Sequence, residues 1–209
     1  MLLPVCAGPF RGARIVANPR ASLRKVLGLY EHELNAWLRS ALPRVSRLID
    51  VGANDGYFAC GCAAAMRRAG RSGEIICYEP QPQHQRELQR GFDAFAGSGH
   101  SARLIAAMVG AREAPGMTTL DALQVADRDN TLIKIDVEGA ELEVLAGAAL
   151  WLRPSNLFVV EVHKRDYLDP LVRLFGSHGL QLTQVDQRPL PFLGREQRDI
   201  DNRWLVSRL

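Results

Sequence analysis

The stretch RLIDVGANDGYFACGCAAAMRR, residues 47–68, carries the pattern on which the fold prediction rests. A short apolar run ends at the acid Asp50, two glycines four residues apart follow (Gly52 and Gly56), and an alanine-rich segment comes next. This order predicts a buried strand, a tight turn and a helix. Ligands of open parallel sheets bind beyond the carboxyl ends of the strands, so the turn is a candidate binding site.

Apolar runs and helical patterns alternate along the rest of the chain. This alternation predicts a doubly wound, mainly parallel seven-stranded sheet in an α/β fold. The last two strands have no helix between them, which predicts a hairpin and hence one antiparallel edge strand. The expected strands are 47–51, 73–79, 102–110, 131–137, 155–163, 180–186 and 202–209, and the expected helices are 29–42, 55–69, 80–95, 118–125, 139–152 and 166–179.

The length of 209 residues favours one domain spanning the whole chain. Within it, we expect a lead-in with an amphipathic helix over residues 1–45 and the core over 46–209. A short hairpin is expected around residues 11–19. The segments 1–30 and 187–202 would contact a substrate but carry no motif that names it, and 187–202 is either a lid or a surface loop.

Composition narrows the function classes. No apolar run is long enough for a membrane helix, and the N-terminus lacks the basic region of a signal peptide, so we expect a cytoplasmic protein. The net charge is +3, but the arginines are scattered rather than striped, which argues against nucleic acid as the main partner. The four cysteines lack the spacing of a zinc site, and no metal is assigned. The oligomeric state is not readable from the sequence.

The turn does not have the form that a dinucleotide requires. The dinucleotide pattern has a glycine where this chain has Asn54, because the pyrophosphate needs that space. Tyr57 adds a bulky side chain, and the G-K-[ST] ending of a P-loop is missing. The turn is therefore expected to hold a nucleoside without a pyrophosphate, although an ordinary strand-to-helix turn would also use glycines here.

Carboxylates around the turn favour a cationic ligand. Asp50 and Asp55 would repel phosphates but suit an ammonium or a sulfonium, and S-adenosylmethionine carries both. Glu79 ends the second strand, where it could accept hydrogen bonds from a ribose diol. Nicotinamide enzymes share that acid, and Glu79 could instead cap the following helix.

A second group of polar residues ends the fourth and fifth strands. Asp136 and Glu138 follow one strand, and Glu161 and His163 end the other. Residues two apart in an extended segment point the same way, so these side chains should converge beyond the sheet. Like charges should raise at least one carboxyl pKa, which suits a general base. Asp136 or His163 is the expected base, with Glu161 orienting the histidine. Solvated loop acids and a divalent metal site remain alternatives.

Several of these segments together resemble the FkbM-like family of class I methyltransferases. The similarity runs from about residue 47 to 183, and KIDVEGAE is its most specific part. The blocks that carry it are LIDVGANDGYFA (48–59), CYEPQPQHQRELQ (77–89), MTTLDAL (117–123), LIKIDVEGAELEVLAGA (132–148) and FVVEVH (158–163), with GLYEHEL (28–34) resembling the leading segment.

The resemblance implies a Rossmann-like fold, S-adenosyl-L-methionine as cofactor, and O-methylation of a hydroxyl on a sugar or secondary metabolite. By position, Asp50, Gly52, Asn54 and Gly56 would line the methionine end, with Tyr57 beside them, and Glu79 would hold the ribose. Ala107 and Met108 would flank the adenine, and the acceptor side would consist of Asp136, Glu138, Glu161 and His163.

The chain departs from the family in one place. Relatives usually have a longer segment between the third strand and the TTLD block, whereas GAREAPGMTTLD (110–121) joins the two almost directly. No aspartate stands beside Met108 for the adenine amino group. The short segment favours one alternative, a non-catalytic adenosylmethionine-binding protein. Two others remain open at lower weight, a nicotinamide-dependent oxidoreductase and a structural or interaction module that binds no adenosyl ligand.

Overall fold

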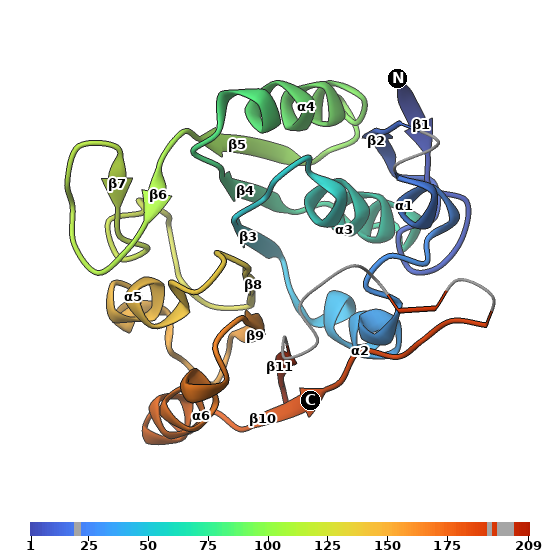
Figure 1. The fold of residues 1–209 in the computed structure, drawn as a ribbon. Helices are drawn as coiled ribbons and strands as arrows, with labels where there is room; N and C mark the ends of the chain where they lie inside the picture. The colour runs from blue at the N-terminus through green and yellow to red at the C-terminus, as the bar shows by residue number, and fades with distance from the viewer. Residues whose placement is uncertain (19–21, 192–193, 196–202) are drawn as a thin grey trace.

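A seven-stranded sheet forms the centre of the computed structural model, which describes residues 1–18, 22–191, 194–195 and 203–209 (Figure 1). The strand order is β10-β11-β9-β8-β3-β4-β5. The strands of this sheet are β3 (Arg47–Val51), β4 (Glu74–Tyr78), β5 (Ser101–Ile105), β8 (Thr131–Ile135), β9 (Leu157–Val162), β10 (Leu182–Val185) and β11 (Arg203–Ser207).

The five strands from β9 to β5 pair in parallel, and β11 is antiparallel to both of its neighbours. Every residue of β3, β8 and β9 is buried, because helices cover both faces of the sheet. The predicted mainly parallel α/β fold is confirmed, as is the terminal hairpin. The last strand, however, lies between β9 and β10, so the edge of the sheet is β10.

Two layers of helices enclose the sheet (Figure 1). On one face, α3 and α4 connect β3 to β4 and β4 to β5, and α2 packs beside them. On the other face, α5 and α6 make the connections that follow β8 and β9. The direction of winding therefore reverses between β3 and β8. The helices are α2 (Asn35–Ala41), α3 (Tyr57–Arg68), α4 (Pro82–Asp93), α5 (Glu141–Ala146) and α6 (Leu168–Ser177).

The N-terminal residues form a small unit against α3 and α4. A hairpin pairs β1 (Leu2–Pro4) with β2 (Arg14–Val16), and α1 (Leu23–Leu27) follows. The hairpin was expected around residues 11–19, but only its second strand lies there, and the first strand is Leu2–Pro4. Phe10, in the turn, packs edge-on against Tyr57 and Phe58 of α3, which anchors the hairpin to the core.

Four predicted elements differ from the structure. The helix expected over 29–42 is shorter, because Glu31 takes a left-handed conformation with a φ of +52° and α2 begins only at Asn35. The strand expected over 102–110 is divided, because its second half turns away as β6 (Met108–Val109) and pairs with β7 (Met117–Thr118). No helix forms over 118–125: the Thr119 hydroxyl accepts the Ala122 N–H as a helix cap would, but only a single turn follows. The helix expected over 139–152 ends at Ala146, since the next backbone carbonyl accepts a hydrogen bond from the Asp121 N–H at 2.9 Å.

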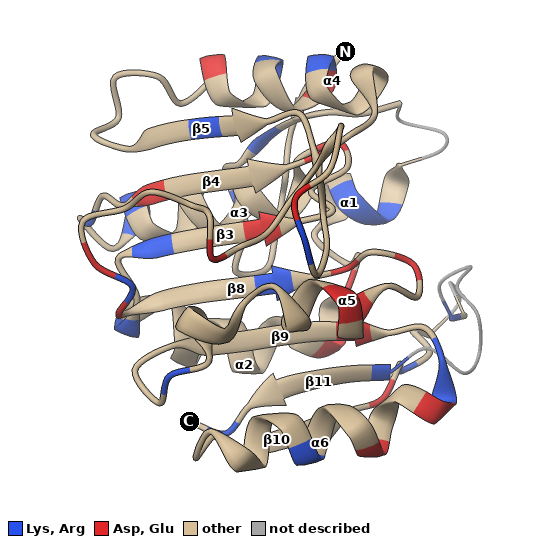
Figure 2. Cartoon of the chain, turned by 90° about the vertical axis from the view of Figure 1, so that its left-hand side faces the viewer, with Lys and Arg blue, Asp and Glu red and all other residues tan. Residues whose placement is uncertain are grey.

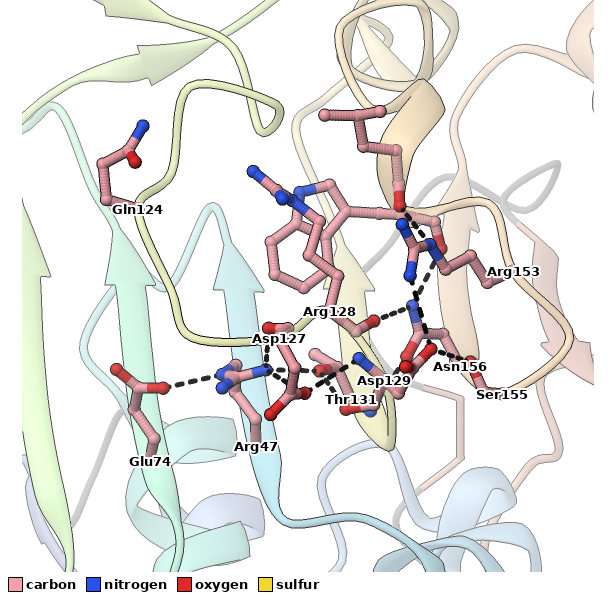
Figure 3. A network of polar contacts seen from close by, with 12 residues as sticks. Arg47, Glu74, Gln124, Asp127, Arg128, Asp129, Thr131, Arg153, Ser155 and Asn156 are labelled. Atoms are coloured by element: carbon pink, nitrogen blue, oxygen red, sulfur yellow. Dashed lines mark hydrogen bonds and ion pairs between the residues drawn. The ribbon is translucent and has the colours of Figure 1, made fainter.

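A polar network fixes the amino ends of the central strands (Figure 3). Arg47 of β3 donates to Glu74 of β4 at 2.6 Å and to the Thr131 hydroxyl of β8 at 3.2 Å. The Thr131 N–H in turn donates to the Asn156 side chain at 3.0 Å. The network ties three neighbouring strands together at one end, which holds their opposite, carboxyl ends in a defined register.

No helix in the described part of the chain combines the length and apolarity needed to cross a membrane. The possible lid over 187–202 falls largely on residues 192–193 and 196–202, which lie outside the described residues.

Candidate active site

A cavity of about 770 Å³ opens at the carboxyl ends of β3, β4 and β8, where the direction of winding reverses. This is the position at which open α/β sheets bind ligands. The predicted residues on its wall are Gly52, Asn54, Glu79, Ala107, Met108, Asp136 and Glu138.

The turn after β3 forms the floor of the cavity. Gly52 has a φ of +80°, and a Cβ there would lie 2.0 Å from the Asp136 carbonyl oxygen, so only glycine fits. Asn54 also takes a left-handed conformation, with a φ of +50°. Its side-chain oxygen accepts the Asp55 N–H at 2.7 Å, which stabilises that conformation locally.

Glu79 joins this turn to the segment after β4. Its carboxylate accepts the Asn54 N–H and the Gln81 N–H, both at 2.8 Å, and the residue is 4% exposed. A carboxylate has about four acceptor positions, so two bonds leave room for two more. Glu79 is therefore held rigidly while it can still receive donors from a ligand in the cavity.

The outer wall is apolar and comes from the short connection after β5. Ala107, Met108 and Val109 lie on one side, with Met117 and Pro80 close by. Met108 is 48% exposed and contributes an apolar side chain to this wall. The shortened segment 110–118 thus supplies part of the cavity lining.

Three predicted cofactor residues lie outside the cavity lining. Asp50 is completely buried on the α3 side of the sheet, Gly56 contacts Leu88 of α4, and Tyr57 packs between Phe10 and Tyr30. A Cβ at position 56 would lie 2.4 Å from Leu88, so the glycine at this position allows α3 and α4 to pack closely. The role assigned to these three residues stays a prediction that the cavity geometry does not favour.

Asp136, Glu161 and His163 converge as expected. One ligand-type atom from each lies within 4.8 Å of the others, a separation at which they could share a cation or a proton. Asp136 also lines the cavity, so it joins this cluster to the ligand space. Glu138 lies apart from the cluster, because its φ of +52° ends the extended path that the prediction assumed.

Two charged residues of the cluster were not predicted. Lys134 of β8, 4% exposed, donates to Asp136 at 2.8 Å and lies beside Asp50 in the sheet register. Glu141 of α5, fully buried, lies 2.6 Å from His163 Nδ1. Lys134 could have been noticed as a single charged residue inside the apolar run TLIKI. For Glu141 the sequence pattern predicts only a helix and gives no sign of its contact with His163.

These neighbours set the protonation of the cluster. Burial opposes the ionised form of Asp136, but the charge of Lys134 and its hydrogen bond lower the Asp136 pKa below its usual value. Burial also disfavours protonated His163, yet the hydrogen bond to Glu141 and the charges of Glu161 and Asp136 raise the His163 pKa. The expected rise in a carboxyl pKa is therefore reversed at Asp136.

Acidic residues gather around the carboxyl ends of the strands and the start of α5 (Figure 2). Asp136, Glu138 and Glu143 line the cavity together with one basic residue, Arg112. The electrostatic character of the cavity is thus acidic beside the cluster.

A profile of the methyltransferase FkbM domain matches residues 95–182, from the end of α4 to the start of β10. The matched part contains the apolar wall and the whole Asp136–His163 cluster. The predicted resemblance to FkbM-like methyltransferases is confirmed. A comparison with curated proteins found no significant match.

Solved structures of methyltransferases share the fold. Methyltransferase FkbM from Methylobacillus flagellatus KT superposes with a TM-score of 0.61 at 18% identity, over 79% of this chain. The chain spans only 44% of that protein's length. Precorrin-6y C5,15-methyltransferase from Geobacter metallireducens GS-15 gives 0.53 at 18% identity, over 84% of this chain and 87% of its own.

The N-terminal domain of human METTL16, solved in complex with SAH, is a further structure with the same fold. Its TM-score is 0.52 at 14% identity, over 84% of the FkbM-like chain and 68% of the human one. At these identities the likeness establishes the class I methyltransferase fold and leaves the methyl acceptor undetermined.

Proposed function

We propose that the protein is an S-adenosylmethionine-dependent O-methyltransferase that acts on a hydroxyl of a small molecule, a sugar or a secondary metabolite. One observation carries the proposal: the cavity at the reversal of winding is lined by Glu79 and by Asp136, and Asp136 forms a cluster with Glu161 and His163.

The residues of the cavity fit this cofactor. Glu79 keeps acceptor positions for a ribose diol, and Ala107 and Met108 offer an apolar surface to the adenine ring. Asp136 and Glu138 supply negative charge for the sulfonium and ammonium groups. The cofactor supplies a methyl group already activated for displacement, so the protein mainly has to align the acceptor and remove its proton.

The cluster provides that proton acceptor. An alcohol becomes a good nucleophile only as its proton is removed. Asp136 lies at the edge of the cavity and His163 directly behind it, with Nε2 3.6 Å from Asp136 Oδ1. Above its raised pKa, neutral His163 can take the hydroxyl proton, and Asp136 can stabilise the imidazolium that results.

The acidic lining favours a small acceptor over a polyanion. A nucleic-acid strand would bring phosphates towards Asp136, Glu138 and Glu143, with one arginine on the wall to attract them. The same charges, together with Asn54 in the turn, disfavour the pyrophosphate of a nicotinamide cofactor.

Isothermal titration calorimetry with S-adenosylhomocysteine and, separately, with NADH tests the cofactor. Binding of the first and not the second is the expected result. In Glu79→Gln, loss of charge-assisted hydrogen bonds should weaken binding about 10- to 100-fold. In Glu138→Gln, loss of an exposed charge should weaken it by no more than about fivefold.

Glu87→Gln on α4 is the control, because this carboxylate lies outside the cavity lining and its loss should leave binding unchanged. Failure of the wild-type protein to bind S-adenosylhomocysteine would refute the proposal. Binding without turnover, measured with labelled S-adenosylmethionine across sugars and hydroxylated metabolites, would identify a non-catalytic binding protein instead.

A further inference from the structure

His163 follows β9, and its ring is held by a carboxylate of α5. Its Nδ1 lies 2.6 Å from Oε1 of Glu141 in the first turn of α5. The same oxygen accepts the Gly139 N–H at 2.9 Å, and Glu141 is 0% exposed. The Glu141 carboxylate is therefore fixed in place by the backbone, and the position of the imidazole follows from it.

Glu141 is suited to be a permanently ionised partner. Burial alone would raise its pKa, but the hydrogen bonds from His163 and from the backbone lower the Glu141 pKa below its usual value. An ionised carboxylate only accepts hydrogen bonds, so the proton between the two groups belongs to Nδ1. Neutral histidine carries one ring proton, which leaves the lone pair on Nε2.

Nε2 points towards Asp136. The distance to Asp136 Oδ1 is 3.6 Å, longer than a direct hydrogen bond, and Asp136 lines the cavity. The free lone pair of His163 thus lies on the Asp136 side of the ring, and the proton lies on the Glu141 side.

We propose that Glu141 is a positioning residue that fixes the Nδ1–H tautomer of His163 and thereby makes Nε2 the proton acceptor of the site. This inference rests on the proposed methyl transfer and replaces Glu161 by Glu141 as the residue that orients the histidine. In the step, the acceptor O–H bond breaks and an Nε2–H bond forms. The oxygen keeps the electron pair for the new bond to the methyl carbon, and the pair of the broken C–S bond leaves with sulfur.

Charges from every neighbouring element support this arrangement. Glu141 faces His163 from α5, Asp136 from the end of β8 and Glu161 from β9. Two neighbouring lysines bind acceptors other than Glu141: Lys134 donates to Asp136 at 2.8 Å, and Lys164 donates to the Gly139 carbonyl oxygen at 2.8 Å. The imidazolium formed on proton transfer would therefore be surrounded mainly by carboxylates.

NMR of the uniformly ¹⁵N-labelled protein tests the inference without cofactor or acceptor. Two-bond ¹⁵N–¹H correlations report the tautomer and pKa of each histidine, and His163→Gln identifies the His163 signals among the five histidines. We expect the Nδ1–H tautomer and a pKa above the usual value of a histidine in the wild type. In Glu141→Gln the His163 pKa should fall, because a charged hydrogen-bond partner is lost.

Glu141→Asp, which keeps the charge, should retain part of the pKa elevation. Glu143→Gln is the matched control in the same helical turn and should leave both readouts unchanged. An Nε2–H tautomer in the wild type would overturn the inference even if Glu141→Gln did not fold. An unchanged His163 pKa in a folded Glu141→Gln would do the same. Neither result depends on whether S-adenosylhomocysteine binds, so failure of this inference is distinguishable from failure of the proposed function.

Discussion

Asp50 is the most isolated charge-bearing residue beneath the cavity. Its carboxylate is fully buried, and neither oxygen has a hydrogen-bond partner among the described residues. Burial raises the Asp50 pKa to about 6, despite the opposing charge of Lys134 in the neighbouring strand. The carboxyl is therefore neutral in weakly acidic solution and ionised, at a cost, above it.

This pKa makes stability depend on pH in a defined direction. A carboxyl whose pKa is higher in the folded state binds more protons there, so stability is greatest below the unfolded value of 3.8 and falls as the pH rises through about 6. The full difference corresponds to about 3 kcal/mol. Asp50→Asn mimics the neutral form at every pH. The free energy of unfolding of Asp50→Asn relative to that of the wild type should therefore increase by up to about 3 kcal/mol between pH 4 and pH 8.

Urea unfolding of both proteins at pH 4 and pH 8 measures this difference. Asp166→Asn, which removes an exposed carboxylate, should show no comparable change between the two pH values. If the free energies of unfolding of Asp50→Asn and the wild type differed by the same amount at both pH values, the raised pKa of Asp50 would be contradicted.

At the scale of elements, two turns on either side of α3 depend on glycine for different reasons. Gly52 and Gly70, which follow β3 and α3, have φ values of +80° and +68°. A Cβ would strike the Asp136 carbonyl at Gly52 and would meet nothing within 4 Å at Gly70. Both positions require a left-handed backbone, but only at Gly52 would a side chain also collide with a neighbouring atom.

Gly70→Ala should therefore cost about 1 kcal/mol of unfolding free energy, the strain of a left-handed residue. Gly52→Ala should cost at least about twice as much and should weaken binding of S-adenosylhomocysteine, because relief of the clash moves the turn or the β8 end. Urea denaturation and calorimetry measure the two effects. Equal costs at the two positions would show that the close approach to Asp136 is not rigid.

The predictable parts of the fold are the segments in which apolar residues follow a clear helix or strand pattern. The buried strands 47–51 and 131–135 and the helix 57–68 follow directly from apolar runs and glycine spacing. The segment 102–125 was not predictable, because its apolar residues fit one long strand as well as two short ones. Local pattern does not show that β6 leaves β5 to pair with β7.

Some residues of the candidate site could likewise be predicted from the sequence and others could not. Asp136, Glu161 and His163 were found because each lies at the carboxyl end of a predicted strand, and parallel strands end at one edge. The roles of Lys134 and Glu141 depend on which side chain each one meets across two elements. Asp50 was expected in the strand 47–51 with its carboxylate beside the ligand, whereas alternation along β3 turns its side chain to the face covered by α3.

At the scale of the whole molecule, Trp204 connects the two ends of the described chain. It is 1% exposed in β11, its Nε1 donates to Glu33 at 3.1 Å, and its ring lies 5.7 Å from the Lys134 ammonium. One side chain thus contacts the N-terminal helical region, the C-terminal strand and the residue that supports Asp136.

Trp204→Ala should destabilise the protein by about 3–5 kcal/mol, as expected for a buried tryptophan. Trp204→Phe should cost clearly less, because it keeps most of the apolar volume and loses chiefly the hydrogen bond to Glu33. Urea unfolding followed by circular dichroism compares the three proteins. Similar losses for both variants would show that the hydrogen bond, and not the packing, connects these regions.

The position of β11 between β9 and β10 has a consequence for folding during synthesis. Residues 157–162 and 182–185 leave the ribosome before residues 203–207, yet they never pair with each other. Until the later strand arrives, the nascent sheet has an apolar β9 with an unpaired edge, the kind of edge that attracts other chains. The pairing of β9 with β11, and with it the burial of Trp204, can therefore form only after residues 203–207 have been synthesised, and until then the edge of β9 can pair with another chain.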